Sequence, residues 1–209
     1  MVPPDTTQSV PKKPRRSREQ RRREISRVAA RLFAEKGYDA TGINELVEAT
    51  GIGKGAFYYH IGSKEELLYE IAVEHVRAMT AFGQALVERT DLSPPEKFHE
   101  LSRQLMRTIV GNLPELTVFF REVGALTRGN RGDELIELRD QFERVWRRIV
   151  ADGVAQGVFK ELDPVAIKCI LGMHNYSYIW IRPRGRLSPE DISDVICEIA
   201  LNGLYAEPA

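Results

Sequence analysis

Residues 41–68 read TGINELVEATGIGKGAFYYHIGSKEELL, and their pattern predicts two short helices joined by a tight turn. The first half carries apolar residues at i, i+3 and i+4, which share one helical face: Ile43, Leu46 and Val47. Thr41 precedes them, and its hydroxyl is placed to accept a hydrogen bond from an unpaired backbone N–H as a helix cap. The helix should end at Gly51, because glycine adopts the left-handed conformation that closes many helices.

A second, shorter helix is predicted from Lys54 to Tyr59, directly after the turn. A helix of this length is not stable alone, so neighbouring elements must hold it. Two helices joined by a tight glycine-containing turn, the second of them short, are typical of a helix-turn-helix that reads DNA. We therefore expect the outer face of this helix to enter the major groove, with Phe57 pointing inward.

Several flanking segments occur in a fixed order: Ala29-Ala30-Arg31-Leu32-Phe33, Gly37-Tyr38, Thr41, Gly51-Ile52, Lys54-Gly55, Phe57-Tyr58, His60 and Ser63-Lys64-Glu65-Glu66-Leu67-Leu68. With these segments, residues 23–68 resemble the TetR family of bacterial transcriptional repressors. The resemblance covers about a fifth of the chain. It departs from the family pattern at Gly42, Gly53 and Ala56, where hydroxyl residues are common, and Gly53 should weaken the cap of the reading helix.

The residue types on the short helix suit contacts with DNA. Lys54 is its one long cation, and it can reach a phosphate or a guanine edge. Tyrosine hydroxyls donate to phosphates and their rings contact thymine methyl groups, although Tyr58 and Tyr59 could instead be core aromatics. Lys64 begins the next helix, where free backbone N–H groups also favour an anion. The resemblance implies the same roles, and the predicted DNA-binding set is Thr41, Lys54, Gly55, Tyr58, Tyr59, His60 and Lys64.

The charge of the chain is unevenly distributed. Its 209 residues are 43% hydrophobic, enough to bury a core in one or two domains, and their formal net charge is zero. Residues 1–60 hold 12 Lys or Arg and 7 Asp or Glu, whereas residues 61–209 hold 18 and 23. A basic front part and an acidic remainder suit a protein whose N-terminal part meets phosphate.

No sequence feature predicts secretion, membrane insertion or a metal site. The N-terminus lacks the apolar core of a signal peptide, and the chain has no run of about 18 uncharged apolar residues. Cys169 and Cys197 lie far apart in apolar periodic stretches, so we expect free buried thiols in a reducing compartment. We expect a soluble cytoplasmic protein without a cofactor.

The N-terminal segment combines proline with basic charge. Residues 1–17 carry four prolines and little apolar surface, which predicts a disordered tail. From Lys12 to Arg23, eight Lys or Arg stand against Glu19 alone. Such a run is either a solvated tail or a basic arm that follows the DNA backbone. Its position directly before the DNA-binding unit favours the arm.

The fold class predicted for the whole chain is all-α, with about nine helices, because no alternation of strand period is present. We expect residues 18–63 to form a three-helix DNA-binding domain and residues 64–209 a larger helical domain for effector binding and dimerisation. A first helix should run from Arg18 to Lys36. Later helix starts are predicted near Ser93, Pro114, Asp133, Asp163 and Ser188.

The fourth predicted helix connects the two domains. Ser63 should cap it, with Glu66 completing a capping box, and the helix should continue to about Glu88. Because its start belongs to the DNA-binding unit and its end to the second domain, it can transmit a shift from one to the other as a rigid rod.

The last two predicted helices indicate a dimer. The helix from Val165 to Ile181 is apolar over most of its circumference, so it must be covered on more than one side. One side can face its own subunit while the other meets a second copy in a two-fold symmetric four-helix interface. The alternative is full burial of this helix within a monomer.

A small molecule would act on the second domain. In repressors of the resembled family, a ligand spreads the two reading heads and abolishes DNA binding. The segment Trp180-x-Arg182-Pro183-x-Gly185 also resembles TetR-type regulators that respond to fatty acyl-CoA or related CoA thioesters. Three arginines within five residues, Arg182, Arg184 and Arg186, could bind a CoA phosphate or could belong to a solvated loop. The predicted pocket residues, each of which could equally be core, are Met106, Phe119, Phe120, Phe142, Trp146, Met173, Tyr176, Trp180 and Arg182.

The sequence thus predicts a homodimeric, ligand-responsive regulator that binds operator DNA, with a repressor as the main form. An enzyme is the rival class, but the four histidines are scattered and no nucleophile motif, glycine-rich phosphate loop or spaced metal-ligand set is present. A third alternative is a DNA-binding or scaffolding protein with a solid second domain.

Overall fold

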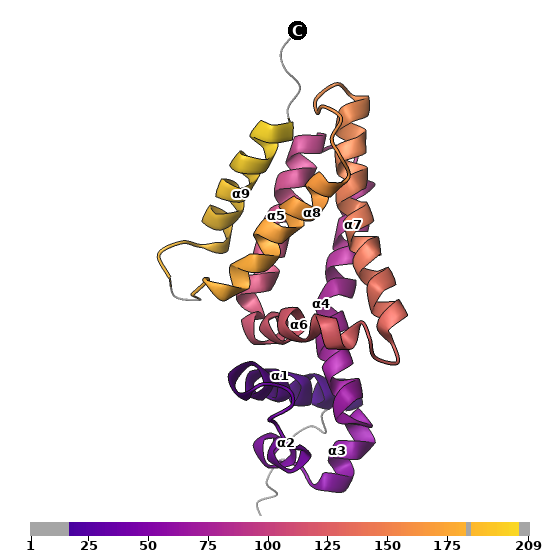
Figure 1. The fold of residues 1–209 in the computed structure, drawn as a ribbon, viewed down its shortest axis with the longest axis vertical. Coiled ribbons are helices and arrows are strands. Elements are labelled where there is room, and N and C mark those ends of the chain that lie inside the picture. The colour runs from indigo at the N-terminus through magenta and orange to yellow at the C-terminus, as the bar shows by residue number, and fades with distance from the viewer. Residues whose placement is uncertain (1–16, 183–184, 205–209) are drawn as a thin grey trace, which may run out of the picture.

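The computed structural model describes residues 17–182 and 185–204, and the regular elements within them are helices (Figure 1). The prediction of an all-α chain with about nine helices is confirmed for this part of the chain. The elements are α1 (Arg18–Lys36), α2 (Ile43–Thr50), α3 (Lys54–Ile61), α4 (Lys64–Val87), α5 (Pro94–Gly111), α6 (Leu113–Leu126), α7 (Gly132–Ala155), α8 (Val165–Tyr176), the short 3-10 helix η1 (Ser177–Ile179) and α9 (Pro189–Leu204).

Helices α1, α2 and α3 form a small unit at one end of the molecule (Figure 1). The bounds of α1 agree with the prediction, and Ser17 caps it in a box with Gln20: the Gln20 N–H donates to Ser17 Oγ at 3.1 Å, and the Ser17 N–H donates to Gln20 Oε1 at 3.0 Å. Ser17 therefore belongs to the folded part and not to the expected tail. The rest of that tail, residues 1–16, lies outside the described residues.

Thr41 does not cap α2, contrary to the prediction. The N-cap residue is Gly42, which offers no side-chain acceptor. Thr41 is fully buried, and its hydroxyl donates to the carbonyl oxygen of Gly37 at 2.8 Å, so it fastens the turn after α1. The other end of α2 is as predicted, since Gly51 has the left-handed φ of 64°.

Helix α4 runs from the small unit into the larger upper part of the molecule (Figure 1). Ser63 caps it by accepting the Glu66 N–H at 3.0 Å. Only this half of the predicted box forms, because the Glu66 carboxylate lies 3.8 Å from Arg22 on α1. The capping interaction thus shares Glu66 with a contact between α1 and α4.

Two hydrophobic cores lie on either side of α6, which crosses the molecule between them (Figure 1). The lower core contains residues of α1 to α4 together with Val118 and Phe119 of α6 and Leu135 of α7. The upper core is built from the end of α4 and from α5, α7, α8 and α9, with Trp146 fully buried in it. The unit of α1 to α3 therefore packs on α6 as well as on α4.

The predicted helix from Val165 to Ile181 is interrupted. α8 ends at Tyr176, the chain tightens into η1, and Trp180 and Ile181 follow outside any helix. The tighter turn directs Tyr178 onto the Phe120 ring, with 5.0 Å between the ring centres, and buries Ile181. Side-chain packing against α6 thus prevails over continuation of the helix.

Two further sequence expectations can be compared with the structure. Cys197 is buried, as expected, but Cys169 is exposed on α8, so the prediction of two buried thiols is half wrong. Both residues are free thiols. Within residues 17–182 and 185–204, no helix combines the length and apolarity needed to cross a membrane.

Candidate nucleic-acid interface and effector cavity

Helix α3 turns one face into the protein and leaves the other open. Phe57 and Ile61 are buried at 0% and 1% exposure, as the inward-facing residues of a three-helix unit. Tyr58 and Tyr59 are 42% and 66% exposed, so the alternative that they are core aromatics is wrong. A Cβ atom added at Gly55 would meet no atom within 4 Å, which shows that this side of the first turn faces open space.

The start of α3 is open as well. Its N-cap is Gly53, which forms no side-chain capping bond, and its first residue, Lys54, is exposed. Lys54 Nζ lies 3.4 Å from Asn44 Oδ1 on α2, a long hydrogen bond that holds the ammonium above the α2–α3 turn. Unpaired N–H groups at a helix start and a cation beside them attract anions such as phosphate.

Two aromatic rings hold cations beside α3. Arg18, at the start of α1, lies 4.9 Å from the Tyr59 ring centre, so the basic beginning of α1 reaches the C-terminal end of α3. Lys64 lies 4.2 Å from the ring centre of Tyr38. The sequence placed Arg18 in the predicted basic arm but not in the predicted DNA-binding set, and it did not single out Asn44, because only the fold shows which residues neighbour α3.

The other arginines at the start of α1 are engaged with acids of the protein. Arg21 pairs with Glu24 at 3.1 Å and Arg23 with Glu19 at 2.7 Å. Arg22 donates from Nε to Glu70 of α4 at 2.6 Å. Among the described residues of the basic run, Arg18 is thus the one held against an aromatic ring of α3.

The seven residues predicted to bind DNA do not share one environment. Lys54, Gly55, Tyr58 and Tyr59 lie on the exposed side of α3, and Lys64 flanks it. His60 is half-buried, and its Nδ1 has no hydrogen-bond partner in the described part of the chain. Thr41 lies in the interior with its hydroxyl engaged, so it is not available to a phosphate.

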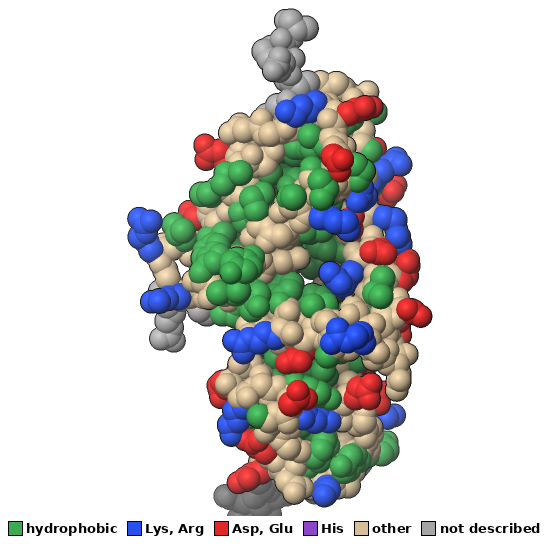
Figure 2. Space-filling view, viewed as in Figure 1, with side chains coloured by type: hydrophobic (Ala, Val, Ile, Leu, Met, Phe, Trp, Pro, Cys, Tyr) green, Lys and Arg blue, Asp and Glu red, His purple; other side chains and the backbone are tan. Residues whose placement is uncertain are grey.

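A cavity of about 390 Å³ opens in the upper part of the molecule, between α4, α5, α6, α7 and α8. Figure 2 shows a hollow in this region, bordered by apolar side chains. Its inner wall is apolar and comes mainly from α4, α5 and α6: Val76, Met79, Leu105, Leu116, Phe119 and Phe120. Volume and lining are those of a site for a small organic ligand.

Three of the nine predicted pocket residues line this cavity: Phe119, Phe120 and Phe142. Met106 and Trp146 are fully buried in the upper core, and Met173 packs against that core. Tyr176 and Trp180 are 63% and 51% exposed on the outside, and Arg182 does not line the cavity. The periodic pattern identified apolar residues correctly but could not separate core from wall and surface.

Apolar side chains also gather on the outer side of α8 and α9. Residues from α8 to α9 that are half or more exposed include Val165, Tyr176, Ile179, Trp180, Val195 and Ile199. Figure 2 shows the resulting apolar patch over these helices. An exposed apolar patch of this kind is typical of an interaction surface. The apolar residues of α9 are thus divided, with Ile192 and Ile196 facing inward and Val195 and Ile199 outward.

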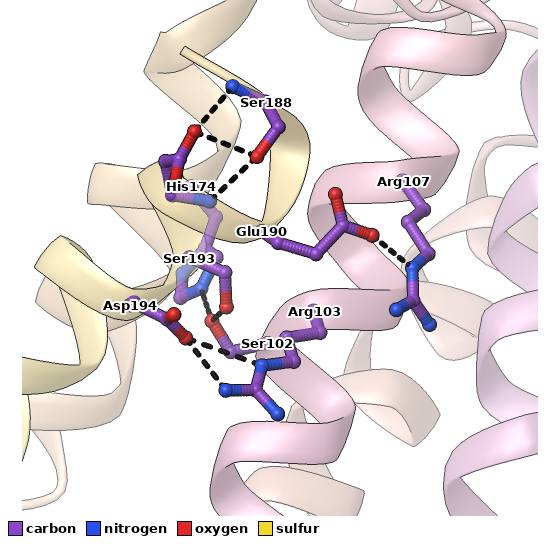
Figure 3. A network of polar contacts seen from close by, with 9 residues as sticks. Ser102, Arg103, Arg107, His174, Ser188, Glu190, Ser193 and Asp194 are labelled. Carbon is purple, nitrogen blue, oxygen red and sulfur yellow. Dashed lines mark hydrogen bonds and ion pairs between the residues drawn. The ribbon is translucent and has the colours of Figure 1, made fainter.

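A buried polar cluster joins α5, α8 and α9 (Figure 3). His174 Nδ1 lies 2.8 Å from the Ile170 carbonyl oxygen, which can only accept, so Nδ1 carries the proton and Nε2 accepts from Ser102 at 2.8 Å. Ser193 Oγ lies 2.8 Å from Ser102 Oγ. Burial lowers the pKa of His174 to about 4, so the ring is neutral at pH 7.

Two ion pairs flank the cluster at the surface of the same helix pair (Figure 3). Arg103 donates to Asp194 at 2.9 Å, and Arg107 donates from Nε to Glu190 at 2.6 Å. Each pair is exposed and therefore stabilises only modestly. Together with the cluster, however, they set the register of α9 along α5.

Comparison with known sequence families assigns both parts of the chain. Residues 25–71 match the family "Bacterial regulatory proteins, tetR family", and residues 91–204, more than half of the chain, match "Tetracyclin repressor-like, C-terminal domain". The chain belongs to the TetR family. It is a DNA-binding transcriptional regulator, and its relatives are transcriptional repressors rather than enzymes.

Individual TetR-family proteins resemble the chain over most of its length. The transcriptional repressor KstR2 of Mycolicibacterium smegmatis is 28% identical over 88% of this chain and 90% of its own. The crystal structure of PfmR from Thermus thermophilus is 35% identical with a TM-score of 0.79, covering 87% of this chain and 99% of PfmR. AibR in complex with isovaleryl coenzyme A and operator DNA is 25% identical with a TM-score of 0.74, covering 86% and 97%.

Proposed function

We propose that this TetR-family protein is a homodimeric repressor that leaves its operator when a small hydrophobic effector, such as a fatty acyl-CoA or another CoA thioester, fills the cavity. The observation that carries the proposal is the open outer face of α3, with Lys54, Tyr58 and Tyr59 exposed around two glycines that leave it accessible. In this proposal residues 18–63 read DNA, and residues 64–209 bind the effector and dimerise.

The DNA contacts follow from the chemistry of that face. Lys54 and the uncapped start of α3 bind phosphate, and Tyr58 and Tyr59 donate to phosphate or contact thymine methyl groups. Lys64 adds a positive charge at the edge of the interface. Arg18 joins this set because it lies against Tyr59. Thr41 is not part of it, since its hydroxyl is engaged in the interior.

Dimerisation through α8 and α9 is supported by the apolar patch on their outer faces. An exposed patch of large side chains such as Trp180 and Ile199 is unfavourable in water and favours association. A two-fold interface uses the same patch on both copies. It would present two copies of α3, which must stand about 34–36 Å apart to enter successive major grooves.

Helix α4 connects the cavity to the DNA-binding unit. Four of its residues line the cavity, namely Ala72, His75, Val76 and Met79, and its first turn carries Lys64 beside α3. A ligand that fits only one position of α4 shifts the population of dimers toward the corresponding spacing of the two reading helices. The complex of AibR with isovaleryl coenzyme A supports a CoA thioester as the effector class here.

Fluorescence anisotropy with labelled DNA from upstream of the protein's own gene tests this proposal. The expected result is binding that is specific in sequence and weakened by salt, and release when acyl-CoAs of increasing chain length are titrated into the complex. Binding that does not distinguish this DNA from a scrambled duplex would contradict a repressor. Binding without release by any acyl-CoA would contradict the effector class and favour a regulator that needs no ligand.

A further inference from the structure

The cavity opens to the surface between α7 and α8, and its opening differs in chemistry from its inner wall. On α7, Ile136, Arg139 and Glu143 follow one another at helical spacing along one face of the opening. On α8, Lys168 and Gly172 lie one turn apart on the facing side. A Cβ added at Gly172 would meet no atom within 4 Å, so this position leaves space at the opening.

Charged side chains are concentrated at this rim. Glu143, 14% exposed, accepts from Lys168 of α8 at 2.8 Å and also pairs with Arg147. Its charge is therefore already compensated from two sides. Arg139 is exposed, and no ion pair joins it to an acid within the described residues. Asp140 also lines the rim. Together with Arg147, the charged residues at the rim carry one net positive charge: Arg139, Asp140, Glu143, Arg147 and Lys168.

The inner wall offers nothing to hold a charge. The polar residues of α4, α5 and α6 that line the cavity are Thr108 and His75, and burial lowers the pKa of His75, which disfavours its charged form. The Thr108 hydroxyl already donates to the Gln104 carbonyl at 2.8 Å. An ion placed there would lose its hydration without compensation.

We propose that the effector is an amphipathic anion that enters between α7 and α8, with its apolar chain on the inner wall and its anionic head at the rim, bound by Arg139 and Lys168. This inference rests on the proposed function and makes it more specific. It assigns the anion to α7 and α8, and not to Arg182, which does not line the cavity.

Lys168 belongs both to the proposed head-group site and to the ion pair with Glu143 that joins α8 to α7. When an anion binds Lys168, it competes with Glu143, which keeps Arg147 as a partner. The ion pair between Glu143 of α7 and Lys168 of α8 is then weakened, but both charges keep a partner: Glu143 keeps Arg147, and Lys168 gains the anion. Since α8 also carries part of the apolar patch proposed for dimerisation, this exchange links ligand entry to the position of the dimer helices.

The experiment compares charged and uncharged ligands of the same chain length. The full-length protein is titrated by calorimetry with dodecanoyl-CoA, dodecanoate and uncharged 1-dodecanol. The variants are Arg139→Gln, Lys168→Gln and the double variant. Arg148→Gln is the matched control, because Arg148 lies on the same helix α7, is 67% exposed, and pairs with Asp152 away from the cavity.

We expect the double variant to bind both anions about tenfold more weakly, or weaker still. This is the effect of losing a charge-assisted hydrogen bond. The affinity of the double variant for 1-dodecanol should change less than about twofold. The affinity of Arg148→Gln for each of the three ligands should also change less than about twofold. Unchanged anion binding by the double variant, or 1-dodecanol bound as tightly as dodecanoyl-CoA, would overturn the inference.

The inference and the proposed function fail in different measurements. If the wild-type protein binds its operator but none of the anions, the assignment of an amphipathic anion is overturned and the DNA-binding regulator stands. If it binds the anions with the predicted dependence on Arg139 and Lys168 but is not released from DNA, the site is supported and the release mechanism is contradicted.

Discussion

Ser102 on α5 and His174 on α8 share a hydrogen bond of 2.8 Å at a place where both side chains are completely buried. Ser193 of α9 joins them, so one polar cluster connects the three helices (Figure 3). Buried polar groups that are all satisfied favour one arrangement of the elements that they join. The position of α8 and α9, the helices proposed to form the dimer interface, is therefore determined in part by interactions inside the subunit.

The buried histidine predicts a dependence of stability on pH. Its pKa of about 4 in the folded protein lies below the value of about 6.5 in an unfolded chain, so the unfolded state binds the proton first. The stabilisation is complete above pH 6.5 and is lost as the pH falls toward 4. Between pH 7 and pH 4, the wild type should lose about 3 kcal/mol more free energy of unfolding than His174→Gln.

Urea unfolding at pH 7, 5.5 and 4, at one protein concentration, measures this difference. His174→Gln is expected to be less stable than the wild type at pH 7, because it disturbs the cluster, but its stability should fall less with pH. Parallel pH profiles for the two proteins would contradict the neutral, buried histidine.

The environment of Thr41 predicts a structural role and no role in DNA binding. Thr41→Val removes the hydroxyl that donates to Gly37 and should lower the free energy of unfolding by about 1–2 kcal/mol. The salt dependence of operator binding should be unchanged, because no phosphate contact is removed. A smaller salt slope with unchanged stability would show that the hydroxyl contacts DNA after all.

Gly83 brings α4 and α7 close together. A Cβ at this position would lie 2.5 Å from Val145 Cγ1, so Gly83→Ala forces the two helices apart or shifts Val145. Overpacking of about 1–3 kcal/mol should exceed the gain of about 1 kcal/mol in helix propensity, and the variant should be destabilised. Adding Val145→Ala should restore part of the loss, as a double-mutant cycle in urea would show. Additive effects of the two changes would contradict the close approach.

The apolar patch on α9 predicts how the dimer can be broken. Ile199 is 60% exposed, so Ile199→Glu should leave the subunit folded while placing a charge in the proposed interface. Light scattering after size exclusion should report a monomer for this variant, with unchanged helical circular dichroism. Ile136→Glu is the matched control, since Ile136 is an exposed isoleucine on α7, and it should remain dimeric. A dimer for Ile199→Glu at the same concentration would place the interface elsewhere.

Local sequence rules predicted most helix ends correctly. The cap at Ser93 and the left-handed Gly51 depend on neighbours only a few residues away, so the sequence is sufficient to place them. Thr41 looked like a cap for the same reason. Its hydroxyl instead donates to the Gly37 carbonyl oxygen in the preceding turn. Burial of Thr41 favours this bond over a capping bond to α2, and burial cannot be read from a local sequence pattern.

The cavity was harder to predict than the reading helix. Phe120 and Trp146 look alike in a periodic pattern, yet Phe120 lines the cavity and Trp146 is sealed in the core. The break of the helix before Trp180 could not be foreseen, because it follows from the packing of Tyr178 on Phe120 of another helix. Contacts between distant segments decided each of these positions.

The most direct test of the account is the salt dependence of operator binding by the wild type and by Lys54→Ala, measured by anisotropy on DNA from upstream of the gene. If a dimer presents Lys54 to phosphate twice, the slope of log K against log salt should decrease by about two, and Lys160→Ala, at the opposite end of the molecule, should leave it unchanged. An identical slope for the wild type and Lys54→Ala would show that α3 does not face DNA.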